Sequence, residues 1–370
     1  MRRKFALLAG VVMGSTALLA LAGEIYLRRT QIYIVAEQES QRRLGFVEHN
    51  PGLLIQNTPR GKRLIPNARV VIKNHWLSGV DIPVRTNSRG FRGDDVAAEP
   101  TPGVPRILML GDSITWGDFV HDDETYVRQT ARALETVLGS RVEVINAGVG
   151  DTGSEEQIDI LEEQGLQVKP DIVVLGFYLN DSRPPWGFAG EQLGGNWLRR
   201  HSLLVDKVHE KVALWRWFQR QGPERFDWIE AQYRLDWKND RAAFLELAQL
   251  ARYDWGAAWD DESWQKVDHE LTRLADHARR NGFRVATLTF PVRFQVDAAF
   301  REDSPQQTFA ALAGKHGFAN LDLLPLFRAH AGQGIFFDWC HPTPPMNEVI
   351  GSAVADFLRN DVTQVRDAHQ

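Results

Sequence analysis

The stretch Arg106-Ile-Leu-Met-Leu-Gly-Asp-Ser113 decides the fold of this chain. It begins as a continuous apolar run and ends in a Gly-Asp-Ser triplet. A short apolar run that ends at a turn residue is typical of a strand buried on both faces, as in a parallel sheet. In open α/β sheets, ligands bind beyond the carboxyl ends of the strands. Ser113 therefore lies at the carboxyl end of the first predicted sheet strand, and it is a candidate for a residue that binds or reacts with a ligand.

Four more short apolar runs follow along the chain, at 142–145, 171–178, 283–290 and 321–324. Helical patterns separate them, at about 125–138, at about 155–168, and before Gly282, where apolar residues recur at a spacing of three or four: Trp264, Val267, Leu271, Leu274 and Ala278. Strands that alternate with helices favour right-handed βαβ units. We therefore predict an α/β fold with a doubly wound, parallel five-stranded sheet.

The length of 370 residues exceeds the ~150 residues of a usual domain. We expect a linker or helix at 24–45, a β-rich extension at 46–100, and the sheet domain at 101–362. Between about 184 and 263 the alternation stops, and we predict a helical insertion there. Indoles in such number favour ordinary packing of a helical subdomain; the alternative is an apolar wall that stacks on sugars. Nine of the 12 tryptophans lie in or beside the insertion: Trp186, Trp197, Trp215, Trp217, Trp228, Trp237, Trp255, Trp259 and Trp264.

The N-terminus has the pattern of a membrane address. Arg2, Arg3 and Lys4 precede an uncharged run from Phe5 to Gly23. As a helix this run is about 28 Å long, close to the ~30 Å of hydrocarbon in a bilayer. We predict a transmembrane signal-anchor over 1–23 with the body exported; the alternative is a signal peptide cleaved after the small residues Ala20-Leu-Ala22.

Composition excludes several classes of protein. Charged residues make up 25% and the net charge is −5, which gives no basic footprint for nucleic acid. The single cysteine, Cys340, excludes an internal disulfide framework and a thiolate zinc site. The sequence has no P-loop and no H-E-x-x-H motif, so we predict neither a metal nor a cofactor.

A second chemical signal lies far along the chain, in Asp338-Trp-Cys-His341-Pro342. A histidine that acts as a general base needs a partner on Nδ1, and Asp338 can reach it from three residues away. Pro342 disfavours helix at His341, so an extended loop is expected there, with Cys340 pointing away from the imidazole. A closing helix is predicted from 345 to 358, with Thr343 as its N-cap and Pro344 as its first residue.

Two further segments offer hydrogen-bond donors for an oxyanion. Residues 146–153 follow the second predicted strand and supply backbone N–H groups, and Asn180 follows the third and supplies an amide. These four segments, in this order, resemble the sequence blocks of the SGNH (GDSL-type) serine hydrolases. The segment Asn87-Ser-Arg-Gly-Phe-Arg-Gly93 resembles the sequence that precedes the first block in membrane-anchored bacterial members of this family.

The resemblance implies a flavodoxin-like sheet and an ester hydrolase. Ser113 would be the nucleophile, His341 the base and then the acid, and Asp338 its orienting partner. The Ser113 and Gly150 N–H groups and the Asn180 amide would form the oxyanion hole. The second block is one residue shorter than in the family, which makes Gly148 a rival for the role of Gly150. The implied partners are an acyl ester, an acylated glycan or lipid, and the membrane.

Three other interpretations remain open at this point. The same triad serves an O-acyltransferase or deacetylase that acts on envelope polysaccharide. A non-catalytic binding or assembly module can also retain this fold. The segment 148–153 also reads G-x-G-x-x-G, the dinucleotide fingerprint, but no acidic residue follows the next strand at the required distance.

Overall fold

The computed structural model describes residues 2–30, 47–48, 54–58, 60–72, 75, 77–183, 197–205, 208–209, 212, 215–216 and 227–368. Trp186 and Trp217, and residues 31–45 of the expected linker at 24–45, lie outside these residues.

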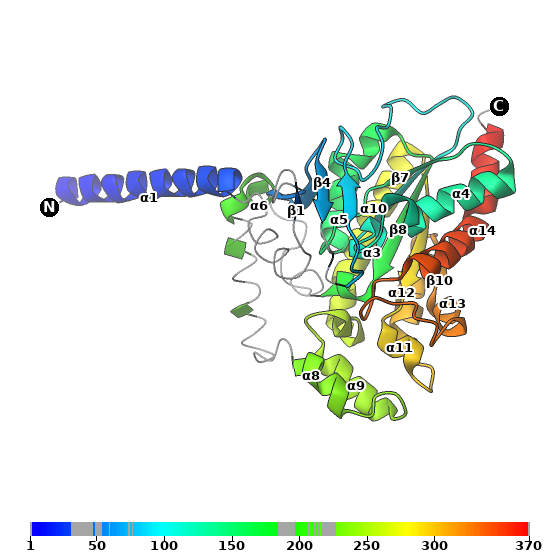
Figure 1. Cartoon of the computed structure of the whole chain (residues 1–370). Coiled ribbons are helices and arrows are strands. Elements are labelled where there is room, and N and C mark those ends of the chain that lie inside the picture. Colours follow the sequence, from blue (N-terminus) through cyan, green and yellow to red (C-terminus); the bar gives the residue numbers. More distant parts are fainter. Residues whose placement is uncertain are drawn as a thin grey trace.

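A five-stranded parallel sheet forms the centre of the protein (Figure 1). Its strands are β6 (Arg106–Gly111), β7 (Glu143–Asn146), β8 (Ile172–Tyr178), β9 (Arg284–Phe290) and β10 (Ala319–Asp322). The strand order is β10-β9-β8-β6-β7. This is the flavodoxin-like order, and it confirms the predicted fold class. The order reverses at β6, so the loops after β6 and β8 diverge at one point of the carboxyl edge.

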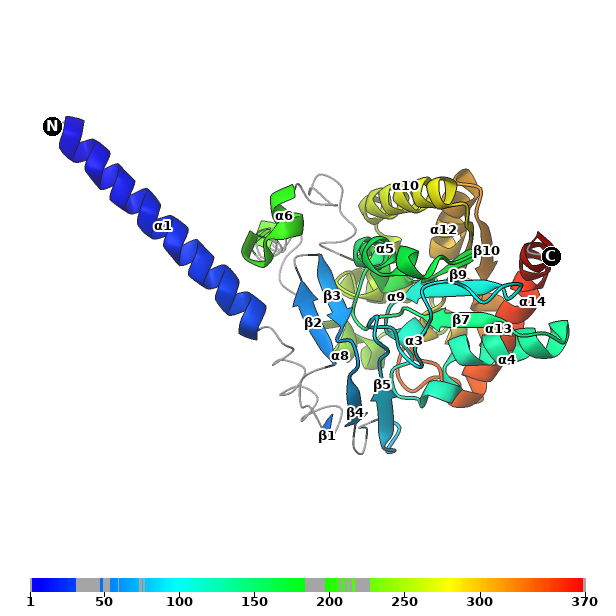
Figure 2. The same ribbon diagram turned by 90° about the horizontal axis from the view of Figure 1, so that it is seen from above.

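Helices cover both faces of the sheet, as Figure 2 shows. On one face α14 packs against α4, and on the other α10 packs against α5 and α12. Gly282 ends α10 in the left-handed conformation, with φ +77°, as its position in the sequence predicts. The bounds of these helices are α4 (Tyr126–Leu138), α5 (Ser154–Glu163), α10 (Trp264–Asn281), α12 (Ser304–Lys315) and α14 (Pro344–Ala368).

Three of the predicted bounds of helices and strands in the sheet domain were wrong. The second helix ends at Glu163, the fifth strand begins at Ala319 instead of Leu321, and α14 continues to Ala368 instead of Leu358. The hydroxyl of Thr343 donates to the Gly334 carbonyl instead of capping α14. The short elements are α3 (Ser113–Trp116), η1 (Asp122–Glu124), η2 (Gly165–Val168), η3 (Leu179–Ser182), α11 (Arg293–Asp297) and α13 (Leu324–Ala329).

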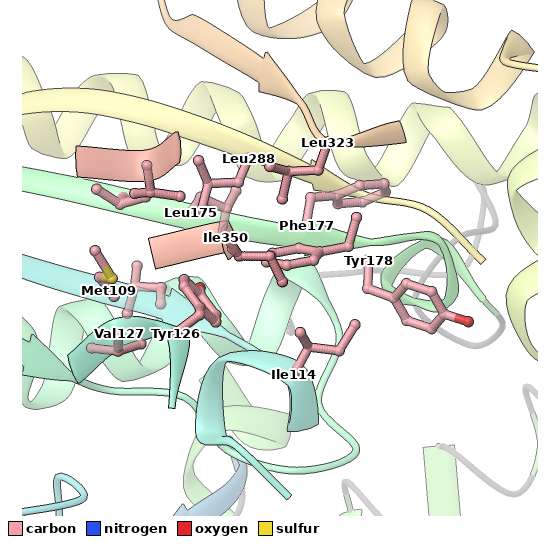
Figure 3. Packing of buried hydrophobic residues seen from close by; sticks show 14 of the residues in the cluster. Met109, Ile114, Tyr126, Val127, Leu175, Phe177, Tyr178, Leu288, Leu323 and Ile350 are labelled. Carbon is pink, nitrogen blue, oxygen red and sulfur yellow. The ribbon is translucent and has the colours of Figure 1, made fainter. Parts of the chain in front are cut away.

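The core lies between the sheet and its helices. Every residue of β6 and β8 is buried, which explains why these strands are continuous apolar runs instead of alternating ones. Figure 3 shows side chains of these two strands beside those of α4, α14 and β9. Burial of a large apolar side chain contributes ~1.5–3 kcal/mol, so this layer accounts for much of the stability of the domain.

Five short strands precede the sheet domain in the chain and lie between α1 and that domain (Figures 1 and 2). The strands β2 and β3 form one antiparallel pair, and β4 pairs with both β1 and β5. The hairpin turn carries Arg60, whose guanidinium bonds Asp159 and Glu162 of α5 and so fixes the hairpin to the domain. Bounds are β1 (Val47–Glu48), β2 (Ile55–Thr58), β3 (Gly61–Leu64), β4 (Arg69–Ile72) and β5 (Ile82–Arg85).

The insertion is mostly helical in the residues that the structure describes, with turns at 235–240 and 251–254 between its helices. Its elements are α6 (Trp197–His201), α8 (Asp227–Arg234), α9 (Arg241–Leu250), η4 (Trp255–Trp259) and η5 (Asp261–Ser263). Trp228, Trp237 and Trp255 are buried, so these three indoles pack within the protein and form no open stacking wall. Trp197 and Trp215, in contrast, are exposed.

The N-terminal helix α1 (Arg2–Thr30) projects away from the rest of the protein (Figure 1). Its segment Leu8–Arg28 is long and apolar enough to cross a membrane. The helix continues past Gly23, where the predicted anchor ends, because Glu24 and Arg28 form an i,i+4 ion pair at 2.6 Å. Glu24 also accepts hydrogen bonds from Ser202, Leu203 and Leu204 of the insertion.

Candidate active site

Ser113 is the first residue of α3, directly beyond the carboxyl end of β6. The Asp112 side chain caps this short helix by accepting from the Ile114 N–H at 2.9 Å. The next residues fold back over the serine, since the Gly117 and Asp118 N–H groups both donate to the Ser113 carbonyl. Ser113 itself is only partly buried, so its hydroxyl lies at a tight turn with access from outside.

A relay of hydrogen bonds joins Ser113 to a loop 228 positions away in the chain. His341 Nε2 lies 2.8 Å from Ser113 Oγ, and His341 Nδ1 lies 2.7 Å from Asp338 Oδ2. The other carboxylate oxygen of Asp338 accepts from the backbone N–H groups of Cys340 and His341. Both Asp338 oxygens are therefore used to hold the imidazole in one orientation.

The electrostatics of this loop favour a protonated imidazole beside a charged carboxylate. Burial alone lowers the pKa of His341, but the Asp338 carboxylate, helped by Asp118 and Asp112, raises it to about 9. Burial alone raises the pKa of Asp338, but the His341 imidazole and the two N–H donors bring it below its usual value. In its neutral form the His341 imidazole is therefore a strong base that can accept a proton from Ser113, and Asp338 stabilises the resulting imidazolium.

The candidate oxyanion donors differ in how free they are. The Gly148 N–H donates to Asn146 Oδ1 at 3.0 Å, and a Cβ on Gly148 would lie 2.3 Å from the Trp116 nitrogen. Gly148 therefore serves close packing against α3. A Cβ on Gly150 would lie 4.0 Å from the Ser113 Cβ, and among the described residues the Gly150 N–H has no hydrogen-bond acceptor. Of the two rivals, Gly150 is therefore the one whose N–H is uncommitted among the described residues, and its role as an oxyanion donor stays a prediction.

Asn180 lies in η3, at the end of β8, the strand that pairs with β6. Its side chain hydrogen-bonds Asp254 of the insertion, which lowers the pKa of that carboxyl, although burial, the larger effect, raises it. An amide has two N–H bonds, so one remains for a substrate oxygen.

Asp151 ties these loops to the N-terminal hairpin, and the sequence analysis missed it. Its carboxylate forms ion pairs with Lys62 of β3 and with Arg183, which follows η3. Asp151 has φ +56°, and an aspartate in the left-handed region is a weak sequence-level signal for such a position.

Phe119 is a second residue that the sequence analysis missed. Its ring centroid lies 4.6 Å from that of His341, edge to face, and 4.3 Å from that of the buried His75. Phe119 has φ +76°, which is a rare conformation for a bulky residue. The only signal available in the sequence is its proximity to the Gly-Asp-Ser triplet.

Cys340 does not point away from His341, contrary to the expectation from an extended loop. Its sulfur lies 3.3 Å from His341 Nδ1, because the loop curls around the Asp338 carboxylate. Asp338, Cys340 and His341 have ligand atoms within 4.8 Å of one another, and among the described residues they form the one group that could hold a metal. Nδ1 is already bonded to Asp338, and burial, the main cause, raises the pKa of the thiol well above its usual value. The expectation of a site without a metal stays a prediction.

The buried tryptophans of the insertion support this loop from behind. The Trp228 ring meets that of Trp339 edge to face, with centroids 5.1 Å apart, and also packs on Trp255 and Phe294. Each such aromatic pair is worth ~0.5–1.5 kcal/mol beyond its buried area. The insertion thus braces the segment that carries Asp338 and His341.

Comparison with known proteins shows which family these features belong to. A family model described as GDSL-like lipase/acylhydrolase matches residues 109–349. No curated protein matches the sequence. Among solved structures, the lipase/acylhydrolase from Enterococcus faecalis is 16% identical, with a TM-score of 0.39 over 70% of this chain and 97% of that chain.

Two esterases are also among the similar structures. An acetyl xylan esterase is 15% identical, with a TM-score of 0.38 over 70% of this chain and 99% of that chain. A two-domain esterase active on acetylated mannans is 13% identical, with a TM-score of 0.40 over 72% of this chain and 50% of that chain.

Proposed function

The chain belongs to the GDSL-like lipase/acylhydrolase family, and we propose that it is an envelope-anchored serine ester hydrolase that works through an acyl-enzyme. The observation that carries the proposal is the relay Asp338–His341–Ser113, with separations of 2.7 and 2.8 Å. A hydroxyl, an imidazole and a carboxylate in this order are the components of nucleophilic acyl transfer.

In the first half of the reaction His341 Nε2 takes the proton of the Ser113 hydroxyl as Oγ attacks the acyl carbonyl. The oxyanion that forms accepts hydrogen bonds from the N–H groups of Ser113 and Gly150 and from the Asn180 amide. Such donors typically contribute ~3 kcal/mol each to lowering the barrier. The imidazolium, stabilised by Asp338, then gives its proton to the leaving alcohol, and the acyl group remains on Ser113.

In the second half water attacks the acyl-enzyme. His341 takes a proton from the water, the tetrahedral intermediate uses the same oxyanion donors, and Ser113 recovers its proton as the carboxylic acid leaves. Asp338 stays ionised throughout and keeps Nδ1–H of His341 directed at itself.

The test is hydrolysis of p-nitrophenyl acetate by the full chain in detergent, together with labelling by a fluorophosphonate probe. Ser113→Ala is expected to abolish both, because it removes the hydroxyl that would carry the acyl group. Ser352→Ala is the matched control, since this serine lies exposed on α14 and bonds only the Glu348 carbonyl among the described residues. Wild-type activity in Ser113→Ala, or a labelled peptide without Ser113, would refute the assignment.

We propose further that residues 1–23 are retained as a membrane anchor, followed by the linker, the β-rich extension at 46–100 and the exported hydrolase domain. The support is the apolar segment Leu8–Arg28, whose side chains are exposed along the helix. Arg28, at the end of this segment, donates to the His201 carbonyl of α6, the short helix that also carries the exposed Trp197 and Leu198, and indoles favour the interface of a bilayer.

The anchor is tested on cells that express the full chain. We expect the protein to stay in the membrane fraction after extraction with alkaline carbonate, and its N-terminal peptide to include residues before Gly23. A soluble protein that begins at Gly23 would show instead that the segment is a cleaved signal peptide.

A further inference from the structure

Arg92 precedes the sheet domain in the chain, yet its side chain lies within the loop that follows the nucleophile. Its guanidinium donates to the backbone carbonyls of Trp116, Gly117 and Val120 at 2.7–2.8 Å, and its Nε bonds Asp122 at 2.6 Å. The side chain is 2% exposed. The carbonyls of one loop are thus gathered around a single buried cation, which fits the planar fork of arginine and not the point charge of lysine.

A tight turn presents Arg92 to this loop. Asn87 Oδ1 accepts from the Arg89 and Phe91 N–H groups, and the Arg92 N–H pairs with the Asn146 carbonyl at the end of β7. Gly90 has φ +80°, and a Cβ there would come within 2.8 Å of the Leu64 carbonyl, so the turn requires glycine. The segment 87–93, which resembles the sequence upstream of the family's first block, therefore forms a tight turn that orients the Arg92 guanidinium toward the loop 116–120.

The loop that Arg92 holds carries two groups that face His341. The Phe119 ring packs edge to face on the imidazole, and the Asp118 carboxylate raises its pKa. Phe119 keeps φ +76°, which costs energy in a bulky residue and persists only when its surroundings enforce it. Gly117 permits the close approach, because a Cβ there would lie 3.2 Å from Arg92 Nη1.

We propose that Arg92 is a positioning residue for the reaction: by fixing residues 116–120 it holds Phe119 against His341 and keeps the imidazole aligned with Ser113. This inference rests on the proposed function, since it assigns His341 the role of base. The N-terminal extension then contributes to the active site through Arg92.

The protein contains a matched control in Arg106, a second fully buried arginine. Arg106 donates to the backbone carbonyls of Ala97, Glu99 and Val168 and forms an ion pair with Glu143 at 2.6 Å. It lies at the amino end of β6, the edge of the sheet opposite to the site. Loss of either arginine removes donors from three buried carbonyls and one ion pair from a carboxylate, but only Arg92 is connected to His341.

The experiment compares Arg92→Met with Arg106→Met in the full chain in detergent, with active sites counted by fluorophosphonate titration. Both variants are expected to lose stability. Arg92→Met should lower kcat for p-nitrophenyl acetate, and the rate of fluorophosphonate labelling, by about 10- to 100-fold at a KM within about twofold, because misplacement by ~1 Å costs that much. Arg106→Met should keep kcat and the labelling rate.

A further variant tests the route through Phe119. In a Phe119→Ala background, Arg92→Met should cause no additional loss of kcat, since the group it positions is gone. Should Arg92→Met fold poorly, Arg92→Lys supplies the same test, because one ammonium cannot bond all three carbonyls and kcat is again expected to fall.

Two outcomes would overturn the inference. One is a wild-type labelling rate in folded Arg92→Met or Arg92→Lys; the other is an equal loss of kcat in the Arg92 and Arg106 variants, which would make the effect structural. Failure of the proposed function looks different, because then the wild-type chain itself would not be labelled at Ser113.

Discussion

Two groups of buried or half-buried carboxylates in this protein lie in opposite environments. Between α5 and α10, Asp159 and Glu162 are bonded by Arg273 at 2.6 and 2.8 Å and also by Arg60. Near Ser113, Asp112 and Asp181 are fully buried, and among the described residues one oxygen of each has no hydrogen-bond partner.

The pKa values follow this difference. Burial raises the pKa of Glu162, but Arg273 and His277 outweigh it and bring the pKa down to about 2. Burial, with no cation to oppose it sufficiently, raises the pKa of Asp112 to about 6, and burial and the nearby Asp112 raise that of Asp181 well above its usual value. The paired carboxylates, Asp159 and Glu162, stabilise the fold. The unpaired carboxylates, Asp112 and Asp181, reduce its stability, and they lie beside the candidate active site, as groups with perturbed pKa values often do.

The largest effect is expected at Asp338, a carboxylate that has a charged partner and also lies in the candidate active site. Asp338→Asn is expected to lower kcat by about 10⁴-fold, because the amide no longer holds His341 in the tautomer that accepts the serine proton. Steady-state hydrolysis of p-nitrophenyl acetate measures this, with Asp361→Asn on α14 as the control. A kcat within tenfold of the wild type would count against the relay.

The next largest effect is expected in the paired group. Arg273→Met should lower the free energy of unfolding by about 3–5 kcal/mol, because three carboxylates, those of Asp159, Glu162 and Glu270, each lose a partner that is only 14% exposed. Arg279→Met on the same helix removes an exposed pair with Asp276 and should cost less than ~1 kcal/mol. Urea denaturation compares the two, and equal losses would mean that burial does not decide the value of these pairs.

The pH dependence of activity should follow His341. The neutral imidazole is the base, so kcat/KM is expected to fall about tenfold for each pH unit below the pKa of the free enzyme. Since that pKa is raised to about 9, activity should still be rising between pH 7 and 9. A profile already flat above pH 6.5 would show that Asp338 does not raise the pKa of His341.

The smallest effect is expected from the unpaired group. Below pH ~4 Asp181 is protonated in both states, and above it the unfolded state gains stability by releasing the proton. Asp181→Asn removes that penalty, so the variant should match the wild type at pH 4 and equal or exceed it by up to ~1 kcal/mol at pH 7.

Glu162→Gln supplies the opposite sign: burial raises the pKa of Glu162, but Arg273 and His277 lower it to about 2, so the variant should cost more stability at pH 7 than at pH 4. Urea denaturation of both variants at the two pH values checks the pair. A loss of stability at pH 7 in Asp181→Asn would mean that this carboxyl is ionised in the folded protein.

Much of the fold follows from the sequence because local patterns decide it. The five apolar runs became the five strands, and Gly282 ended α10, since burial on both faces and left-handed φ are properties of single segments. The family resemblance that rests on the Gly-Asp-Ser and Asp-x-x-His segments was confirmed by the family model. Their roles in catalysis stay predictions.

The rest depended on contacts between segments that no local pattern specifies. Asp151 with Lys62, Phe119 with His341, and Arg92 with three carbonyls each join residues brought together only by the tertiary fold. The prediction that Cys340 points away from His341 was wrong for the same reason. The conformation of that loop depends on the Asp338 carboxylate, which accepts from the Cys340 N–H, and not on Pro342 alone. The bounds of α14 depended on its packing against α4.

The separation of 228 positions between Ser113 and His341 has a consequence for biosynthesis. His341 lies three residues before α14, which packs on α4. While a ribosome is still translating the insertion, the emerging polypeptide carries Ser113 but not yet His341. The pair of Ser113 and His341 therefore forms late in synthesis, and an unfinished chain lacks it.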